Sequence, residues 1–259
     1  MTRYPALSAL RVGCVQYLNA RPLIHGYAGP VVFDHPSGLA RDLASGALDV
    51  ALVPVFEALR HPRYLIADGV AIASDGPVFS VFLAHRGPLA EVRTIALDPA
   101  SLTSVHLLQV LLAEYHGLRP RLLDLSAFPS EADAVLLIGN QAIDFRERDA
   151  GAHQLLDLGE EWHRRTGLPF VYAPWLLRPD LPNAPAIAGE LRALKRHGTA
   201  RIAEIVRSDP HNAALSARYL TEHIRFDLGP RENTGIEKFR ELLVKRGFSP
   251  ASDEPLRYV

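Results

Sequence analysis

Residues 94–112 read TIALDPASLTSVHLLQVLL. The first four residues form a short apolar run typical of a β-strand, and from Val105 onward apolar residues recur at helical spacing. The turn between them carries Ser101, Thr103 and Ser104. The first N–H groups of a helix lack intrahelical partners and carry the positive end of the helix dipole, so hydroxyls placed there complete a carboxylate or phosphate site. This stretch predicts a strand, a helix and an anion site between them.

Polar side chains stand at two further strand-to-helix junctions. Ser37 follows His35 and Pro36 at the start of a predicted helix, and Asn19 follows the apolar strand at residues 11–15. Three such junctions indicate one cleft for a small anion, bound by uncharged donors.

Strand-like and helical segments alternate along most of the chain, which predicts open, largely parallel sheets covered by helices. Ligands of such sheets bind beyond the carboxyl ends of the strands. We expect strands at residues 10–16, 31–33, 50–53, 70–74, 78–85, 94–97, 134–138 and 170–177. Beyond about residue 183 the pattern is helical, at 185–207, 212–224 and 232–246, and we expect no chemistry there.

Two extended segments that contain proline near their start, residues 76–85 and 168–175, bracket the middle of the chain. We expect them to cross between two lobes. The first lobe then comprises residues 1–82 plus 176–259, and the second residues 83–175. This division places Ser80 at a hinge that faces the cleft.

The composition favours an ordinary globular protein. The 259 residues have a net charge of −1, so no basic field exists to attract nucleic acid or an anionic membrane, and neither partner is expected. The single cysteine, Cys14, lies in an apolar strand and is predicted to be a buried small hydrophobe. We expect no metal and no cofactor, and the apparent lack of a signal peptide favours the cytoplasm. The sequence does not predict an oligomeric state.

Several motifs between residues 12 and 175 resemble one known family, the chorismate dehydratases of the futalosine route to menaquinone. The motifs are VGCVQYLNARPL (12–23), PSGLA (36–40), GALDVALVPVFE (46–57), ASDGPVFSV (73–81), ALD (96–98) with the hydroxyl-rich turn, LLIGNQAI (136–143), LDLGEEW (156–162) and TGLPFVYA (166–173).

This resemblance implies an α/β fold of the periplasmic-binding-protein-like type II topology, with a ligand cleft between two lobes and a helical C-terminal segment. It implies elimination of water from the dicarboxylate chorismate to give 3-[(1-carboxyvinyl)oxy]benzoate. The implied catalytic residues are Asn19 and Ser80. The implied substrate-binding residues are Ser37, Ser101, Thr103, Ser104, Gly139 and Asn140.

One position departs from the family pattern, because Asn140 stands where aspartate is expected. If that carboxylate only caps or accepts hydrogen bonds, asparagine replaces it; if it sets a local charge, the site assignment there weakens.

None of these site residues is basic near neutral pH. We therefore expect a substrate-assisted reaction in which the enolpyruvyl carboxylate takes the ring proton. Glu57 or a histidine is the alternative acceptor.

Two other functions stay open at this point. One is a cytoplasmic sensor that binds a small anion in the same cleft, since fold alone does not separate capture from catalysis. The other is the sister enzyme of the pathway, which opens cyclic dehypoxanthinylfutalosine. That activity requires a histidine base in the second lobe, and residues 136–143 contain none.

Overall fold

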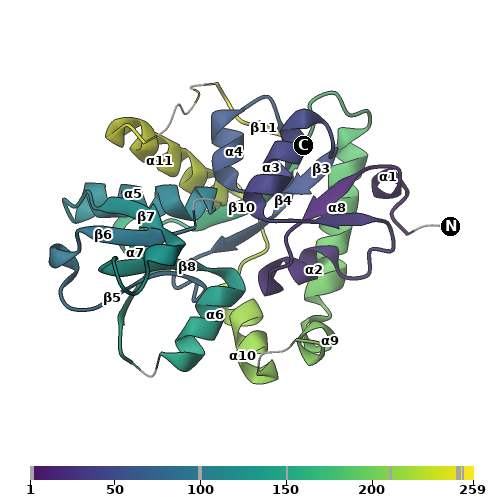
Figure 1. Ribbon diagram of the computed structural model, residues 1–259. Helices are drawn as coiled ribbons and strands as arrows, with labels where there is room; N and C mark the ends of the chain where they lie inside the picture. The colour runs from purple at the N-terminus through teal and green to yellow at the C-terminus, as the bar shows by residue number, and fades with distance from the viewer. Residues whose placement is uncertain (1–2, 99–100, 150, 210–211, 249–251, 253) are drawn as a thin grey trace.

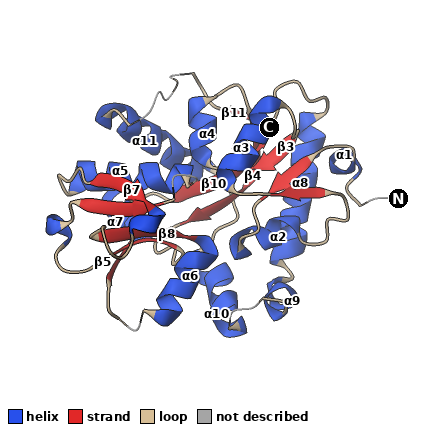
Figure 2. Ribbon diagram, viewed as in Figure 1, coloured by secondary structure: helices blue, strands red, loops and turns tan. Residues whose placement is uncertain are grey.

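The computed structural model describes residues 3–98, 101–149, 151–209, 212–248, 252 and 254–259. They form two mixed β-sheets, each flanked by helices, with the first sheet on the right and the second on the left in Figures 1 and 2. Within these stretches, no helix combines the length and the apolar character that crossing a bilayer requires.

The first sheet has six strands in the order β11-β4-β10-β3-β1-β2. β1 pairs in parallel with β2 and β3, and β10 runs antiparallel between β3 and β4. The bounds are β1 Val12–Cys14, β2 Val31–Phe33, β3 Val50–Leu52, β4 Leu65–Ser74, β10 Phe170–Leu177 and β11 Arg257–Tyr258.

The second sheet has five strands in the order β7-β6-β8-β5-β9. β6 pairs in parallel with β7 and β8, whereas β5 is antiparallel to both of its neighbours. The bounds are β5 Val81–His85, β6 Thr94–Leu97, β7 Arg121–Asp124, β8 Ala134–Ile138 and β9 Gln154–Asp157.

Helices cover both sheets, and the C-terminal ones wrap around the molecule from α8 on the right to α11 at the upper left (Figure 1). The α-helices are α1 Pro5–Ser8, α2 Arg21–Ile24, α3 Pro36–Ser45, α4 Val55–Arg60, α5 Leu102–Tyr115, α6 Gly139–Arg148, α7 Leu158–Thr166, α8 Ala184–Thr199, α9 Ile202–Arg207, α10 Ala213–Arg218 and α11 Pro230–Arg246. The 3₁₀ turns are η1 Leu18–Ala20, η2 Leu89–Glu91 and η3 Leu125–Ala127, and η4 Tyr219–His223 is a π-helical turn.

A buried aromatic cluster joins α7, β10 and α11. The Trp162 ring lies 5.1 Å from Phe170 and 6.1 Å from Phe239, and its Nε1 donates to the Pro169 carbonyl at 3.1 Å. Edge-to-face aromatic packing of this kind adds to the apolar area that the rings bury. The cluster therefore fastens the C-terminal segment to the middle of the chain.

All eight predicted strands are present, although β1, β3 and β5 are shorter than predicted and β4 begins earlier, at Leu65. Three further strands were not predicted. β7 and β9 are short, half-buried edge strands with polar ends, and β11 has two residues, so none carries a clear apolar pattern. Residues 78–80, predicted as strand, precede β5 because Phe79 adopts a left-handed conformation. The predicted helix at 185–207 is two helices, α8 and α9.

The chain passes from the first sheet to the second between β4 and β5, and it returns between α7 and β10. Residues 170–175, which the sequence assigns to the second lobe, pair with β3 and β4 of the first sheet. The lobe boundaries at 82/83 and 175/176 stay a prediction.

Phe79 lies in the first of these crossings and has φ of +69°, which non-glycine residues rarely adopt. Its N–H donates to Asp157 Oδ2 at 2.7 Å, and its carbonyl accepts from Arg146 Nε at 2.8 Å. The Arg146 guanidinium lies 4.5 Å above the ring. A strained residue persists when its surroundings over-determine it, as they do here.

The Asp157 carboxylate is buried and serves two elements at once. It accepts from the N–H groups of Val78 and Phe79 in the crossing, and it caps α7 through the N–H groups of Gly159 and Glu160. A side chain of the second sheet therefore holds the crossing in place through these hydrogen bonds.

Replacing this carboxylate should destabilise the protein. We expect Asp157→Ala to lower the free energy of unfolding by about 3 kcal/mol, because it leaves buried N–H groups and the Arg146 guanidinium without their acceptor. Urea unfolding measures the loss. Asp124→Ala is the matched control, since Asp124 caps the exposed turn η3 and should cost only about 1 kcal/mol. Equal losses in the two variants would contradict the proposed importance of the crossing.

Candidate functional site

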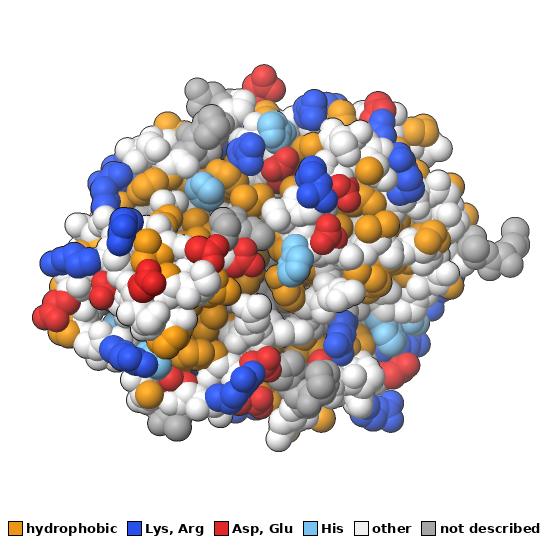
Figure 3. Space-filling model, viewed as in Figure 1, with side chains coloured by type: hydrophobic (Ala, Val, Ile, Leu, Met, Phe, Trp, Pro, Cys, Tyr) orange, Lys and Arg blue, Asp and Glu red, His pale blue; other side chains and the backbone are white. Residues whose placement is uncertain are grey.

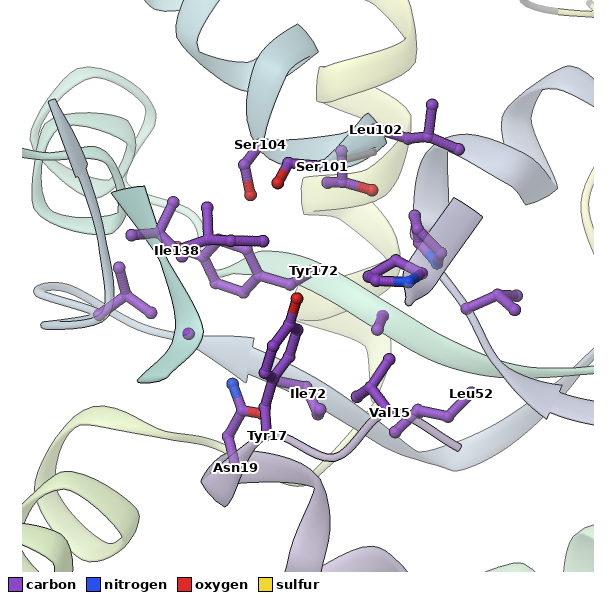
Figure 4. A pocket seen from close by; sticks show the side chains of 18 residues that line it. Val15, Tyr17, Asn19, Leu52, Ile72, Ser101, Leu102, Ser104, Ile138 and Tyr172 are labelled. Carbon is purple, nitrogen blue, oxygen red and sulfur yellow. The ribbon is translucent and has the colours of Figure 1, made fainter. Parts of the chain in front are cut away.

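A cavity of about 600 Å³, part of it open to solvent, lies between the two sheets. Figure 4 shows Tyr17 and Asn19 entering it from one side and Ser101 and Ser104 from the opposite side. The 18 described residues that line it are Val15, Tyr17, Asn19, Pro36, Leu52, Val53, Pro54, Ile72, Val78, Val81, Ser101, Leu102, Thr103, Ser104, Ile138, Gly139, Tyr172 and Ala173.

The cavity lies where several strands end. The chain leaves β1 toward Val15, β3 toward Val53 and β8 toward Gly139, all at carboxyl ends of strands. This is the position at which open α/β sheets bind ligands.

The start of α5 supplies the hydroxyl groups at one end of the cavity. Ser101, Thr103 and Ser104 all line it, as the sequence predicts. Thr103 Oγ1 accepts from the Phe56 N–H at 3.2 Å, which ties α5 to α4 of the other sheet. Within the described chain, the Ser101 side chain makes no capping bond to α5. The helix start therefore presents hydroxyls and unpaired N–H groups together, which suits a carboxylate.

Asn19 lines the opposite end of the cavity, in η1 after β1. Among the described residues, its Oδ1 has no hydrogen-bond partner although the atom is buried. Ser80 lies behind this wall: its side chain is fully buried, it is absent from the described lining, and its Oγ is 2.7 Å from the Tyr219 hydroxyl. The structure thus brings Asn19 to the cavity and links Ser80 to Tyr219.

Gly139 begins α6 with φ of +58°, and its N–H donates to the Ser80 carbonyl at 2.9 Å. A Cβ at this position would meet the Tyr17 ring at 2.9 Å. Glycine is therefore required by both the backbone and the close approach of Tyr17.

Asn140 faces a second, larger cavity that shares Val15 and Tyr17 with the first. Its Oδ1 accepts from the Leu18 N–H at 3.2 Å, a bond between the two sheets' elements. Asparagine thus fills the acceptor role that an aspartate would have there.

Ser37, in the first turn of α3, is half-buried and is not among the described residues that line the main cavity, although its neighbour Pro36 is. At this second strand-to-helix junction, Pro36 therefore lies at the cavity, and Ser37 is not among the described lining residues.

The cavity has no formal charge of its own: of the lining residues that the structure describes, none is Asp, Glu, Lys, Arg or His. Burial raises the pKa of Tyr17, and Asp98 adds to the effect. Burial also raises the pKa of Tyr172 well above its usual value, helped by Asp157 and opposed by the Ser74 hydrogen bond. Both phenols therefore stay neutral donors at physiological pH.

The alternative proton acceptors lie elsewhere. Glu57 is buried on α4, with Arg60 and His61 at 3.8 and 3.6 Å. His106 stacks on Phe56 at 3.6 Å, and its Nδ1 lies 2.7 Å from the Leu102 carbonyl. Neither side chain is among the described residues that line the cavity.

The described residues hold no cluster of three or more metal-ligating side chains. Cys14 is a buried free thiol, as predicted. On the face shown in Figure 3, acidic and basic side chains are interspersed.

The sequence model of a family described as menaquinone biosynthesis matches residues 10–245. The chain belongs to this family. A curated relative from Thermus thermophilus, named chorismate dehydratase, is 32% identical over 90% of this chain and 94% of its own length. A second protein of that name, from Campylobacter jejuni, is 31% identical over 61% of this chain and 58% of its own length.

Solved structures show the same fold at low sequence identity. A protein of Archaeoglobus fulgidus is similar with a TM-score of 0.72 and 15% identity, covering 93% of this chain and 98% of that one. The alkanesulfonate-binding protein SsuA of Xanthomonas axonopodis pv. citri follows with a TM-score of 0.66 and 15% identity, covering 93% and 94%. The predicted periplasmic-binding-protein-like α/β fold is confirmed.

Three tyrosines of this menaquinone-family member were not predicted as site residues. Tyr17 and Tyr172 stand inside motifs already noted, but a tyrosine in an apolar context gives no signal of its own. Tyr219 comes from the C-terminal segment, for which we expected no chemistry, and only the fold brings it to Ser80.

The approach of Tyr17 to Gly139 can be tested by a matched pair of substitutions. Gly167 also has positive φ, and nothing lies within 4 Å of an added Cβ, so Gly167→Ala reports backbone strain alone, about 1–2 kcal/mol. Gly139→Ala should lose about 1 kcal/mol more in urea unfolding, because its methyl also presses on the Tyr17 ring. Equal losses would mean that Tyr17 yields freely.

Proposed function

We propose that the protein is a chorismate dehydratase, a hydro-lyase that converts chorismate to 3-[(1-carboxyvinyl)oxy]benzoate and water. The names of its two curated relatives support this activity. The observation that carries the proposal is the cavity itself, which has uncharged donors at opposite ends and apolar walls between them. The futalosine pathway and the cytoplasmic location are parts of the same proposal.

Three parts of chorismate have a counterpart in the cavity. One carboxylate is placed at the start of α5, where Ser101, Thr103 and Ser104 donate. The ring is placed between apolar side chains such as Leu52 and Ile138. The ring hydroxyl is placed near Asn19, whose amide oxygen is an available acceptor.

The proton acceptor is the substrate's own enolpyruvyl carboxylate. It takes the proton from the ring carbon that bears the ether oxygen, and the electrons of that C–H bond form the new ring double bond. The C–O bond to the neighbouring hydroxyl breaks, and the hydroxyl leaves as water when it takes the proton from the carboxyl group. Lining side chains that are neutral at pH 7 support this mechanism, because the described lining residues include no base.

Positioning replaces the missing base. Well-oriented intramolecular reactions gain roughly 7–11 kcal/mol from placement, and formation of an aromatic ring makes the step favourable. In this mechanism Asn19 holds the leaving hydroxyl. Ser80 is the second catalytic residue that the resemblance implies.

Asn19→Ala should lower kcat for chorismate by about 100-fold or more while the fold is retained, because the leaving hydroxyl loses its partner. Turnover is followed by the ultraviolet spectrum and by a product one water lighter than chorismate. Asn233→Ala is the control, since Asn233 lies on α11 and its side-chain oxygen is likewise buried without a partner in the described chain.

Two results would count against the proposal. Near-normal turnover in Asn19→Ala would refute the role of Asn19. Tight binding of chorismate by the wild-type protein without conversion would favour the alternative function, a sensor that binds a small anion.

The pH profile tests the substrate-assisted step. The pKa values of Tyr17 and Tyr172 are raised above the ordinary tyrosine value of about 10, so both phenols keep their protons throughout the assay range, and the substrate carboxylate is ionised above about pH 5. We expect kcat to be constant between about pH 6 and 9. A rise or fall of kcat through a pKa near 6 or 7 would indicate a histidine or Glu57 as the base instead.

A further inference from the structure

The Tyr219 hydroxyl lies at the centre of a buried hydrogen-bonded group behind the cavity. Tyr219 and Ser80 are 1% and 0% exposed, and their oxygens are 2.7 Å apart. Asn19 is the third member: burial raises the pKa of the Tyr219 phenol, and hydrogen-bond donation from Ser80 and from the Asn19 side chain opposes that rise. One phenol therefore touches both residues that the sequence predicts to be catalytic.

This arrangement fixes which end of the Asn19 amide is used. Because Oδ1 has no partner among the described residues, the bond to Tyr219 uses the amide N–H. A buried acceptor without a donor is unfavourable, and this cost is removed when a donor arrives. The carboxamide is thus held with its nitrogen on Tyr219 and its oxygen available to a hydroxyl group in the cavity.

Tyr219 is itself placed by an unusual backbone. It opens the π-helical turn η4, a rare element often found at functional sites. From the same turn, His223 Nδ1 lies 3.0 Å from the Pro77 carbonyl, and its ring stacks on Phe79 at 5.1 Å. The turn therefore contacts residues 77–80 at three points and cannot shift without moving the crossing.

We propose that Tyr219 is a positioning residue of the dehydratase site: its hydroxyl anchors the Asn19 amide nitrogen and Ser80, so that Asn19 Oδ1 accepts the substrate's ring hydroxyl. The inference rests on the proposed function. It also gives Ser80 a role compatible with its burial, because Ser80 acts through Tyr219 and Asn19 rather than by touching substrate.

Tyr219→Phe tests this inference, because it removes one oxygen and keeps the packed ring. We expect kcat for chorismate to fall about 10- to 100-fold with KM changed less than about threefold, since the hydroxyls of α5 still bind the carboxylate. Tyr64→Phe is the matched control and should keep wild-type kcat. Tyr64 is equally buried, and its hydroxyl has no partner in the described chain. It directly precedes Leu65, the first residue of β4, and is not among the described residues that line the cavity.

A double-mutant cycle separates positioning from general stability. Ser80→Ala should lower kcat in the wild-type background and cause little further loss in Tyr219→Phe, because both changes break the same group. Additive losses, or wild-type kcat in Tyr219→Phe, would overturn the inference.

A measurement without substrate separates this inference from the proposed function. The side-chain ¹⁵N–¹H signals of Asn19 should shift in Tyr219→Phe and not in Tyr64→Phe. Unshifted signals refute the anchoring. A second outcome combines shifted signals in Tyr219→Phe with a wild-type protein that does not convert chorismate. It would refute the proposed activity, and with it the role of Tyr219 in turnover, while the anchoring of Asn19 would stand.

Discussion

The carboxylate of Asp157 is the contact on which the position of the site depends. It receives two N–H groups from the segment that joins the sheets and two more from the start of α7. Ser80 follows that segment directly, and its carbonyl receives the first N–H of α6 from Gly139. A buried carboxylate is stable only when its acceptor capacity is filled, and here backbone groups fill it. One side chain therefore sets the register between two walls of the cavity.

The described lining of the cavity presents dipoles rather than charged groups. Hydroxyls at the start of α5, the amide of Asn19 and neutral phenols supply the donors and acceptors. Fixed dipoles in an apolar surrounding act strongly on developing charge, since they need no reorganisation. In the proposed function, such a site would orient a dianion without supplying a competing base, which agrees with a reaction that the substrate performs on itself.

Local pattern was enough to predict the eight main strands and the position of the α5 hydroxyls and of Asn19 at the cavity, because each depends on residues close in sequence. Ser37 lies in the first turn of α3 but is not among the described residues that line the main cavity, so its role in binding stays a prediction. The edge strands β7 and β9 were missed because their half-buried sequences lack clear alternation. Phe79 was read as strand, since its left-handed backbone is imposed by Asp157 and Arg146 from other elements. Tyr219 was not predicted as a site residue, because residues far away in the sequence bring it to Ser80.

The bond between Ser80 and Tyr219 joins residues 139 positions apart in the chain. During synthesis at about 5–20 residues per second, roughly 7–28 s pass between the addition of the two residues to the growing chain. Asn19 and Ser80 are therefore made before the phenol that joins them. The site is thus completed late in biogenesis, so a nascent chain has a hydrophobic cleft before it has a finished one.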